Sequence, residues 1–349
     1  MELNKLLRPH LVNLVPYSSA RDEYSGSASV YLDANENPFD ITGGHGVNRY
    51  PDPHQRLLKE KVAGLKNIST DRIFLGNGSD EAIDLLFRAF CQPGTDNVII
   101  LPPTYGMYTV SAGINDIEVR KVLLTPDYQP DVDRVMAAID EHTKMLFLCS
   151  PNNPTGNDMD PERVYSLLQS FDGLVVVDEA YIDFSRRESH IADLEAYPNL
   201  VVLQTFSKAW GMAGLRLGMA FASPEVVSIM DRIKPPYNVN SLTQKVALEA
   251  LDKDKEKDAL VEELIAQRDL VDRKLGHMDQ VKRTYPSDAN FILAEMNGDA
   301  VDMYRYLVGR GVIVRDRSKV QLCDNCLRIT VGTAEENDKL LSELANYEQ

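Results

Sequence analysis

The sequence predicts an α/β fold, in which a mostly parallel sheet is sandwiched by helices, together with a smaller α+β domain. Between about residues 70 and 222, short apolar runs alternate with amphipathic stretches, as in parallel sheets wound with helices. The runs are continuously apolar, which is typical of strands covered on both faces. After Pro235 and Pro236 this alternation ends, and a charged helical stretch followed by shorter elements indicates a second unit.

The main sheet is predicted from six apolar runs, at residues 72–76, 97–101, 145–149, 174–178, 200–204 and 217–222. Amphipathic segments between some of them predict helices at residues 80–91 and 161–171. Polar or turn-forming residues follow several of these strands. Because ligands bind outside the carboxyl ends of the strands in open α/β sheets, we expect the functional site there.

The C-terminal part predicts shorter elements. Residues 244–275 predict a charged amphipathic helical stretch, broken or loosened around 252–258. The segments FILAEM, GVIVRD and LRITVG predict strands, with helices near residues 300–309 and 335–347. The charge run at 252–258 is most simply a solvated face.

A chain of 349 residues exceeds the usual size of a single core, so we expect one large and one smaller domain. The predicted large domain comprises residues 45–235. The N-terminal arm, residues 1–44, is expected to join residues 236–349 in the second domain.

Composition narrows the class of protein. The 37 basic and 53 acidic residues leave a formal charge of −16, which disfavours nucleic acid and anionic lipid as partners. No apolar run has membrane-spanning length, and the N-terminus lacks the apolar stretch of a signal peptide. Four cysteines make no disulfide framework. We therefore expect a cytoplasmic protein with no membrane and no nucleic-acid partner.

The loop Gly76-Asn77-Gly78-Ser79-Asp80-Glu81 joins a predicted strand to a predicted helix. It is not a dinucleotide fingerprint, because Glu81 stands at the third glycine position, and it is not a Walker motif. Ser79 and Asp80 lie at the helix start, where free N–H groups and the helix dipole favour a phosphate. A simple N-cap at Ser79 explains the same residue types.

Asp178 ends a run of leucine and valine, so its carboxylate is expected at the edge of a buried sheet. An ionised group there is costly unless it is paired. Its partner is either the backbone N–H groups of the following turn or a cation such as a protonated ring nitrogen. Tyr181, three residues later, is placed to face the same space.

Lys208 lies in TFSKAWGMAGLRLG, directly after a predicted strand. Most lysines are solvated surface residues. A partly desolvated lysine near another cation, however, has a lowered pKa and becomes a nucleophile toward aldehydes. Arg216 supplies such a cation and is suited to hold a phosphate dianion in bidentate fashion.

We expect no metal site. Cys323 and Cys326 form CDNC, but a single C-x-x-C without a second pair at metal spacing is weak grounds for zinc or redox chemistry. The six histidines are scattered and suggest no catalytic triad.

Taken together, the chain resembles the fold-type I pyridoxal-phosphate aminotransferases over almost its whole length. The order of NPTG, DEAY and SK…GLRLG is typical of that superfamily. PTYGMY, LVPYSSAR near the N-terminus, and the pair Arg315 and Arg328 narrow the resemblance to its histidinol-phosphate branch. The motifs that carry the resemblance are ANENP, RYPDP, GSDEAI, PPTYGMY, SPNNPTG, VVDEAYIDF, TFSKAWGMAGLRLG, VIVRDRS and CLRITVGT.

The resemblance implies a catalytic set around pyridoxal 5'-phosphate. Lys208 is expected to bind the cofactor's aldehyde covalently and later to move the substrate proton. Asp178 is expected to pair with the ring nitrogen, while Tyr181 and Asn153 hydrogen-bond the ring oxygen. Tyr105 is expected to stack on the ring face.

The resemblance also implies a site for the cofactor's phosphate. Ser79, Asp80, Ser207 and Arg216 are expected to hold it. In relatives, a tyrosine at the position of Tyr50 reaches that phosphate from the neighbouring subunit, so a homodimer with shared active sites is implied.

Substrate recognition is expected from Arg315, Arg328 and, by resemblance, Tyr17. Two guanidiniums are able to clamp a phosphate dianion, and one suffices for a carboxylate. Surface ion bridges to acids such as Asp316 explain the arginines equally well without the resemblance. The resemblance implies transamination of L-histidinol phosphate with 2-oxoglutarate, giving imidazole acetol phosphate and L-glutamate, in histidine biosynthesis.

Three other functions remain open at this point. Threonine-phosphate decarboxylase and aromatic amino acid aminotransferase share the cofactor and closely similar architecture. A non-enzymatic regulator that senses pyridoxal phosphate belongs to another class. It is disfavoured, because neither a DNA-binding helical module nor a basic surface is evident.

Overall fold

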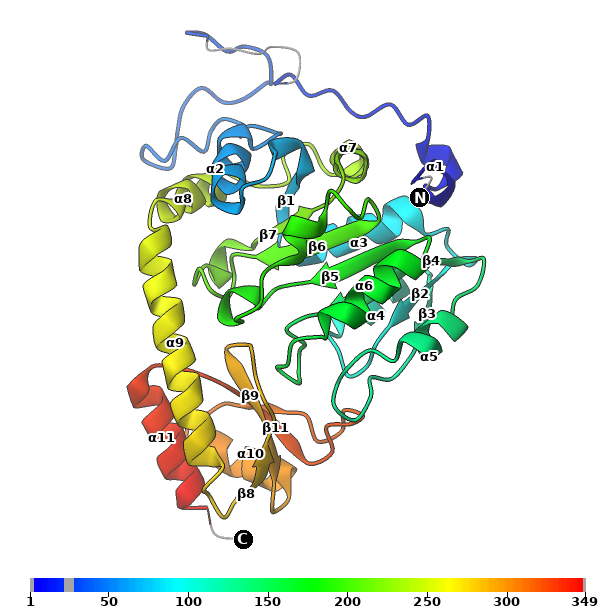
Figure 1. Ribbon diagram of the computed structural model, residues 1–349. Helices are drawn as coiled ribbons and strands as arrows, with labels where there is room; N and C mark the ends of the chain where they lie inside the picture. The colour runs from blue at the N-terminus through cyan, green and yellow to red at the C-terminus, as the bar shows by residue number, and fades with distance from the viewer. Residues whose placement is uncertain (1–2, 22–27, 348–349) are drawn as a thin grey trace.

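The structure, a computed structural model, describes residues 3–21 and 28–347, and its largest element is a seven-stranded sheet (Figure 1). The strand order is β1-β7-β6-β5-β4-β2-β3. Strand β7 pairs antiparallel with both neighbours, and the other pairings are parallel. This confirms the predicted mostly parallel sheet. The strands are β1 (Ile73–Asn77), β2 (Asn97–Ile100), β3 (Glu118–Lys121), β4 (Thr143–Cys149), β5 (Leu174–Asp178), β6 (Leu200–Thr205) and β7 (Leu217–Phe221).

Helices cover both faces of this sheet (Figure 1). Several begin at local capping signals. Asp160 and Ser223 cap two helices that start with proline, which the first turn tolerates because its N–H groups have no helical partner. The α-helices up to the second sheet are α1 (Leu3–Leu6), α2 (Arg56–Lys66), α3 (Ser79–Phe90), α4 (Met107–Ile114), α5 (Val132–Ala137), α6 (Pro161–Ser170), α7 (Pro224–Ile233), α8 (Ser241–Leu251) and α9 (Asp254–Leu275).

The apolar runs build two cores, one on each face of the sheet. Along β5, Val175 and Val177 belong to one cluster, whereas Leu174 and Val176 belong to the other. Because successive side chains of a strand point to opposite faces, a strand covered on both sides must be apolar throughout. This is the physical reason for the uninterrupted runs in the sequence.

A second, antiparallel sheet lies beyond helix α9, which leads from α8 to it (Figure 1). Its order is β10-β11-β9-β8. Helix α9 contributes Val271 and Leu275 to an apolar cluster with this sheet. The helical stretch is interrupted between α8 and α9 at Asp252 and Lys253, at the start of the predicted 252–258 interruption. The elements are β8 (Val281–Thr284), β9 (Phe291–Met296), α10 (Ala300–Gly309), β10 (Arg315–Asp316), β11 (Cys326–Thr330) and α11 (Ala334–Ala345).

Strands β3 and β8 were not predicted from the sequence. Their sequences, EVRK and VKRT, are polar and largely open to solvent, so they lack an apolar pattern. Within the described residues, no helix combines the length and apolar character needed to cross a membrane. The division of the chain into residues 45–235 and the two flanking segments stays a prediction.

Candidate active site

The site lies where the carboxyl ends of the parallel strands meet. Strands β1, β2, β4, β5 and β6 run in the same direction, so the segments that follow them gather at one edge of the sheet. Tyr105 follows β2, Asn153 follows β4, Asp178 ends β5, and Lys208 follows β6. Residues separated by up to about a hundred positions in sequence therefore meet at this edge.

A cavity of about 140 Å³ opens among these segments. Every predicted cofactor-binding residue lines it except Tyr50. The roles of these residues stay predictions, but the structure brings them together. The lining comprises Gly78, Ser79, Asp80, Tyr105, Cys149, Asn153, Asp178, Ala180, Tyr181, Thr205, Ser207, Lys208, Ala213 and Arg216.

Asp178 is buried at the floor of this cavity, with 2% of its surface exposed. Its Oδ2 accepts a hydrogen bond from the Tyr108 hydroxyl at 2.7 Å, and its Oδ1 accepts one from the backbone N–H of Ala180 at 3.1 Å. Burial raises the pKa of the carboxyl to about 6, although both hydrogen bonds oppose the rise. No ion pair joins Asp178 to a residue that the structure describes, so a cation in the cavity would find its charge available.

Lys208 shares the cavity, and its Nζ lies 5.5 Å from the ring centroid of Tyr181. Burial lowers the pKa of this ammonium, and the positive charges of Arg328 and Arg216 lower it further. A larger fraction of the amine is therefore neutral at physiological pH than for a solvated lysine. A neutral amine is the form that attacks a carbonyl carbon.

The start of helix α3 forms one wall of the cavity. Its N-cap is Gly78 at φ 75°, and no side chain caps the first turn. The alternative of an N-cap at Ser79 is therefore wrong, because Ser79 is already the first helical residue. A Cβ on Gly78 would lie 2.9 Å from Nη2 of Arg216, which also lies 3.6 Å from Oδ2 of Asp80. Uncapped N–H groups beside a guanidinium make a site for an anion such as phosphate.

The remaining predicted cofactor residues are held by hydrogen bonds across the cavity. The Tyr105 hydroxyl donates to Oδ1 of Asp80 at 3.1 Å. The Asn153 amide donates to the Tyr181 hydroxyl at 3.4 Å, and its carbonyl oxygen accepts from Nη1 of Arg328. A side chain of the second sheet thus reaches the edge of the first.

Arg315 and Arg328 lie directly opposite each other on β10 and β11. Burial lowers the pKa of Arg328, and the charge of Arg315 lowers it further. Neither arginine forms an ion pair with a carboxylate of the described residues. Asp316 instead accepts a hydrogen bond from the backbone N–H of Ser318 at 2.8 Å. The alternative of surface ion bridges to Asp316 is therefore not realised.

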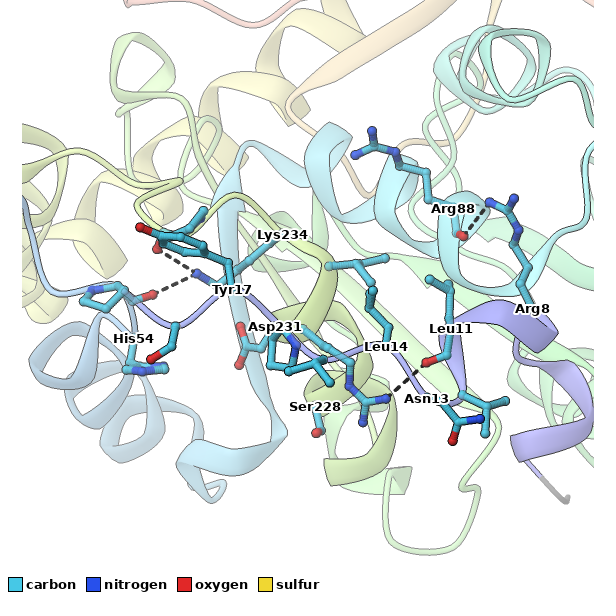
Figure 2. A pocket seen from close by; sticks show the side chains of 18 residues that line it. Arg8, Leu11, Asn13, Leu14, Tyr17, His54, Arg88, Ser228, Asp231 and Lys234 are labelled. Atoms are coloured by element: carbon cyan, nitrogen blue, oxygen red, sulfur yellow. Dashed lines mark hydrogen bonds between the residues drawn. The ribbon is translucent and has the colours of Figure 1, made fainter. Parts of the chain in front are cut away.

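Four predicted site residues are not part of the cavity lining, namely Tyr17, Tyr50, Arg315 and Arg328, and the two tyrosines lie away from it within a single chain. Tyr17 is 74% exposed and lines a groove between the N-terminal arm and the end of α7, where Figure 2 shows it beside Lys234. Tyr50 stacks on Tyr237 with ring centroids 4.4 Å apart. Their roles in substrate and cofactor binding stay predictions.

Sequence reasoning missed two residues that shape the cavity. Tyr108 is fully buried and donates to Asp178, and the Thr205 hydroxyl accepts from the backbone N–H of Ser207 at 3.1 Å. Tyr108 stands in the motif PPTYGMY, but its position alone does not reveal a partner 70 residues away.

Comparisons with known proteins show the family of the chain. Residues 23–344 match the sequence model of the family described as aminotransferase class I and II. The chain is 56% identical over 345 residues to the histidinol-phosphate aminotransferase of Cytophaga hutchinsonii, which covers 99% of each protein. It is 54% identical over 347 residues to that of Bacteroides fragilis strain YCH46, again covering 99% of each.

Among solved structures, the fold is similar to that of histidinol-phosphate aminotransferase from Sinorhizobium meliloti in complex with pyridoxal-5'-phosphate. The TM-score is 0.78 at 24% identity, covering 86% of this chain and 82% of that one. The family of the chain is shown by the family match and by the full-length identities. The chain therefore belongs to the class I and II aminotransferases and, within them, to the histidinol-phosphate aminotransferases.

Proposed function

We propose that the protein is a pyridoxal-phosphate-dependent aminotransferase. It transfers an amino group from L-histidinol phosphate to 2-oxoglutarate, giving imidazole acetol phosphate and L-glutamate, in histidine biosynthesis. The observation that carries the proposal is one cavity with three features: a lysine of lowered pKa, a buried carboxylate that has no cationic partner among the described residues, and an anion site at a helix start.

The chemistry of this cavity fits pyridoxal phosphate group by group. Asp178 offers a buried negative charge to a protonated ring nitrogen. The uncapped start of α3 and the guanidinium of Arg216 offer donors to a phosphate, and the glycine at position 78 leaves room that a Cβ would fill. Lys208 offers an amine to an aldehyde. The partners for the ring nitrogen, the phosphate and the aldehyde therefore all line the same cavity.

The mechanism follows from what these residues do. Pyridoxal phosphate, when bound, supplies a ring that accepts the electrons released when the Cα–H bond of the substrate breaks. Asp178 would hold the ring nitrogen of the cofactor in its protonated form through its buried negative charge. Lys208, whose pKa is lowered by burial, would act at its Nζ as the general base that takes up the Cα proton of the substrate and passes that proton on within the site. Asn153 orients the Tyr181 hydroxyl toward the same space.

Substrate binding is assigned to the arginines of the second sheet. Arg328 reaches Asn153 and is well placed for a substrate anion, whereas Arg315 lies across the strand pair from it. Two guanidiniums suit a phosphate dianion, and Arg328 alone suits the carboxylate of glutamate. This division supports histidinol phosphate and glutamate as alternating substrates of one site.

We also propose that the enzyme works as a homodimer in the cytoplasm. Tyr17 and Tyr50 lie away from the cavity of their own chain, which leaves them available to the site of a partner subunit. All four cysteines are free thiols, as is usual in a reducing compartment.

Half-reaction spectroscopy of the purified holoprotein tests the proposal. Histidinol phosphate should convert the absorbance of lysine-bound cofactor to that of the amino form, and 2-oxoglutarate should restore it. Carbon dioxide release from threonine phosphate indicates the decarboxylase, and a better response to phenylalanine indicates the aromatic enzyme. Cofactor binding without turnover of any amino compound indicates a regulator. Borohydride reduction followed by peptide mapping should label Lys208 and no other residue.

A further inference from the structure

A third arginine, Arg317, shares the face of the second sheet that carries Arg315 and Arg328. Its backbone N–H donates to the carbonyl of Cys326 at 2.9 Å, which extends the β10–β11 pairing by one step. Residues two apart on an extended strand point to the same side, so Arg315 and Arg317 project together. Arg328 lies opposite Arg315 and therefore projects to that side as well.

This face is turned toward the central sheet. Leu327 and Ile329 of β11 lie in the core of the second sheet, on its other face. Cys326 and Leu293, which share the face with the arginines, instead belong to the core cluster of the central sheet. The three guanidiniums are thus carried on the side from which Arg328 reaches the cavity wall at Asn153.

The positive charges of this cluster are not neutralised by the protein. None of the three arginines forms an ion pair with a carboxylate in residues 3–21 or 28–347. The Nε atoms of Arg317 and Arg328 are buried and have no hydrogen-bond partner. Burial lowers the pKa of Arg317, and the charges of Arg328 and Arg315 lower it further. Like charges placed side by side on a strand pair destabilise it, so the arrangement favours binding of an anion.

The charge of Arg317 also reaches the active site. Burial raises the pKa of the Tyr181 hydroxyl, while the positive charges of Arg328 and Arg317 act in the opposite direction. Tyr181 lines the cavity that holds Lys208. The positive charge of Arg317 therefore adds to that of Arg328 on this side of the cavity.

The CDNC segment holds Arg317 in place. The Cys326 carbonyl accepts from Arg317, and the Cys326 N–H donates to the Cys323 carbonyl at 3.1 Å. The Tyr128 hydroxyl, from the central-sheet side, donates to the Leu322 carbonyl at 2.8 Å. Both thiols are buried. The turn between the two strands is thereby tied to both parts of the molecule.

We propose that Arg317 is a third guanidinium of the substrate site and binds the phosphate of the phosphorylated substrate. This inference rests on the proposed function and deepens it. A phosphate dianion has the charge and the three terminal oxygens to engage several guanidiniums, whereas a carboxylate engages one in bidentate fashion. Arg317 thus makes the site favour a phosphate monoester over a second carboxylate.

The test compares three variants of the holoenzyme. Arg317→Gln removes the charge, Arg317→Lys keeps it, and Lys319→Gln removes an exposed charge from the same turn as a matched control. Half-saturation is measured by cofactor absorbance with histidinol phosphate and, separately, with glutamate. The inhibition constant of inorganic phosphate against glutamate is measured as well.

For Arg317→Gln we expect binding of histidinol phosphate and of inorganic phosphate to weaken roughly tenfold or more, because a charge-assisted hydrogen bond is lost. Half-saturation by glutamate should change by less than about threefold, Arg317→Lys should recover part of the loss, and Lys319→Gln should match the wild type.

Equal weakening for glutamate and histidinol phosphate in Arg317→Gln would show a structural role and overturn the inference. Unchanged binding of inorganic phosphate would overturn it too. If the wild type does not react with histidinol phosphate, the proposed function fails. Phosphate competition against glutamate then still decides the role of Arg317 by itself.

Discussion

Burial acts in opposite directions on the two residues at the centre of the chemistry. It raises the pKa of Asp178 to about 6 and lowers the pKa of Lys208. Both changes favour the neutral form of the group in the absence of cofactor. In the proposed complex, a protonated ring nitrogen beside Asp178 would favour the ionised carboxylate, so cofactor binding is expected to stabilise the folded protein.

The pH dependence of the apoprotein follows from the raised pKa of Asp178. Its carboxyl holds a proton up to about pH 6 in the folded chain but loses it near its ordinary value of 3.8 when unfolded. Between about pH 4 and 6 the folded state binds more protons, so stability falls as pH rises, by up to about 3 kcal/mol from this group. Asp178→Asn should remove that part of the slope.

Urea unfolding of the apoprotein and of the variant between about pH 4 and 7 measures this difference. Asp158, whose pKa burial also raises to about 6, contributes equally to both proteins and cancels in the comparison. Parallel stability curves for the two proteins would contradict the expected burial cost at Asp178.

Substitutions of Arg315 and Arg328, which lie opposite each other on β10 and β11, should affect the two substrates differently. Arg328→Ala is expected to weaken both histidinol phosphate and glutamate, because its guanidinium reaches the cavity wall at Asn153. Arg315→Ala should mainly weaken the phosphorylated substrate. Loss of a charge-assisted hydrogen bond predicts changes of roughly tenfold or more in half-saturation. The same loss for both substrates in Arg315→Ala would contradict this division of labour.

At the scale of elements, the anion site depends on the close approach of β7 to the start of α3. A Cβ on Gly218 of β7 would lie 2.2 Å from the backbone nitrogen of Ser79. Backbone atoms cannot yield as a flexible side chain does, so glycine at this position allows the helix start to sit against the sheet. The N–H groups that face the cavity are positioned by this contact.

Gly218→Ala should therefore push the start of α3 away from the sheet. We expect a loss of stability of about 1–3 kcal/mol, as for overpacked cores, and a clearly weaker affinity for pyridoxal phosphate. Gly113→Ala in α4 is the control, because its Cβ meets no atom within 4 Å and the change in the unfolded chain is the same. Thermal unfolding and cofactor titration measure both effects. Equal cofactor affinity in the two variants would refute the positioning role of Gly218.

At the scale of the whole molecule, the N-terminal arm exposes large apolar side chains. Val15, Leu32, Phe39 and Ile41 are each at least 79% exposed. Apolar groups gathered on one segment are typical of a surface that another protein covers. Together with the positions of Tyr17 and Tyr50, this supports a dimer in which the arm contacts the partner subunit.

Subunit mixing tests whether the sites are shared. Lys208→Ala and Tyr50→Ala place their defects on different sides of a shared site, so a mixed dimer contains one site free of both. We expect activity to appear when the two variants are unfolded and refolded together, up to about a quarter of the wild-type level from random pairing. Lys208→Ala mixed with Asp178→Ala is the control. Both residues line the cavity of their own chain, so every site of that mixed dimer still carries one defect. A monomeric mass in solution, or no recovery in the first mixture, would contradict the shared site.

Much of the fold and of the cofactor cavity was predictable because the determinants are local. Continuous apolar runs mark strands covered on both faces, and the residues directly after such strands must gather at one sheet edge. Polar edge strands such as β3 carry no such pattern and were missed. The sequence allowed Ser79 to be interpreted as the N-cap of α3. The structure shows Gly78 in that role, next to the close contact between Ser79 and Gly218 of β7, which the sequence does not reveal.

By itself, the sequence determined the apolar strands of the central sheet and their order along the chain, the lysine and carboxylate of the cavity, and the family. Only the tertiary structure decided which polar groups meet across long separations. Examples are the Tyr108 hydroxyl on Asp178 and Arg328 on Asn153. It also placed Arg317 beside two other arginines, and none of the three forms an ion pair with a carboxylate that the structure describes. Such contacts depend on how separate elements pack, and burial then sets the charge state of each group.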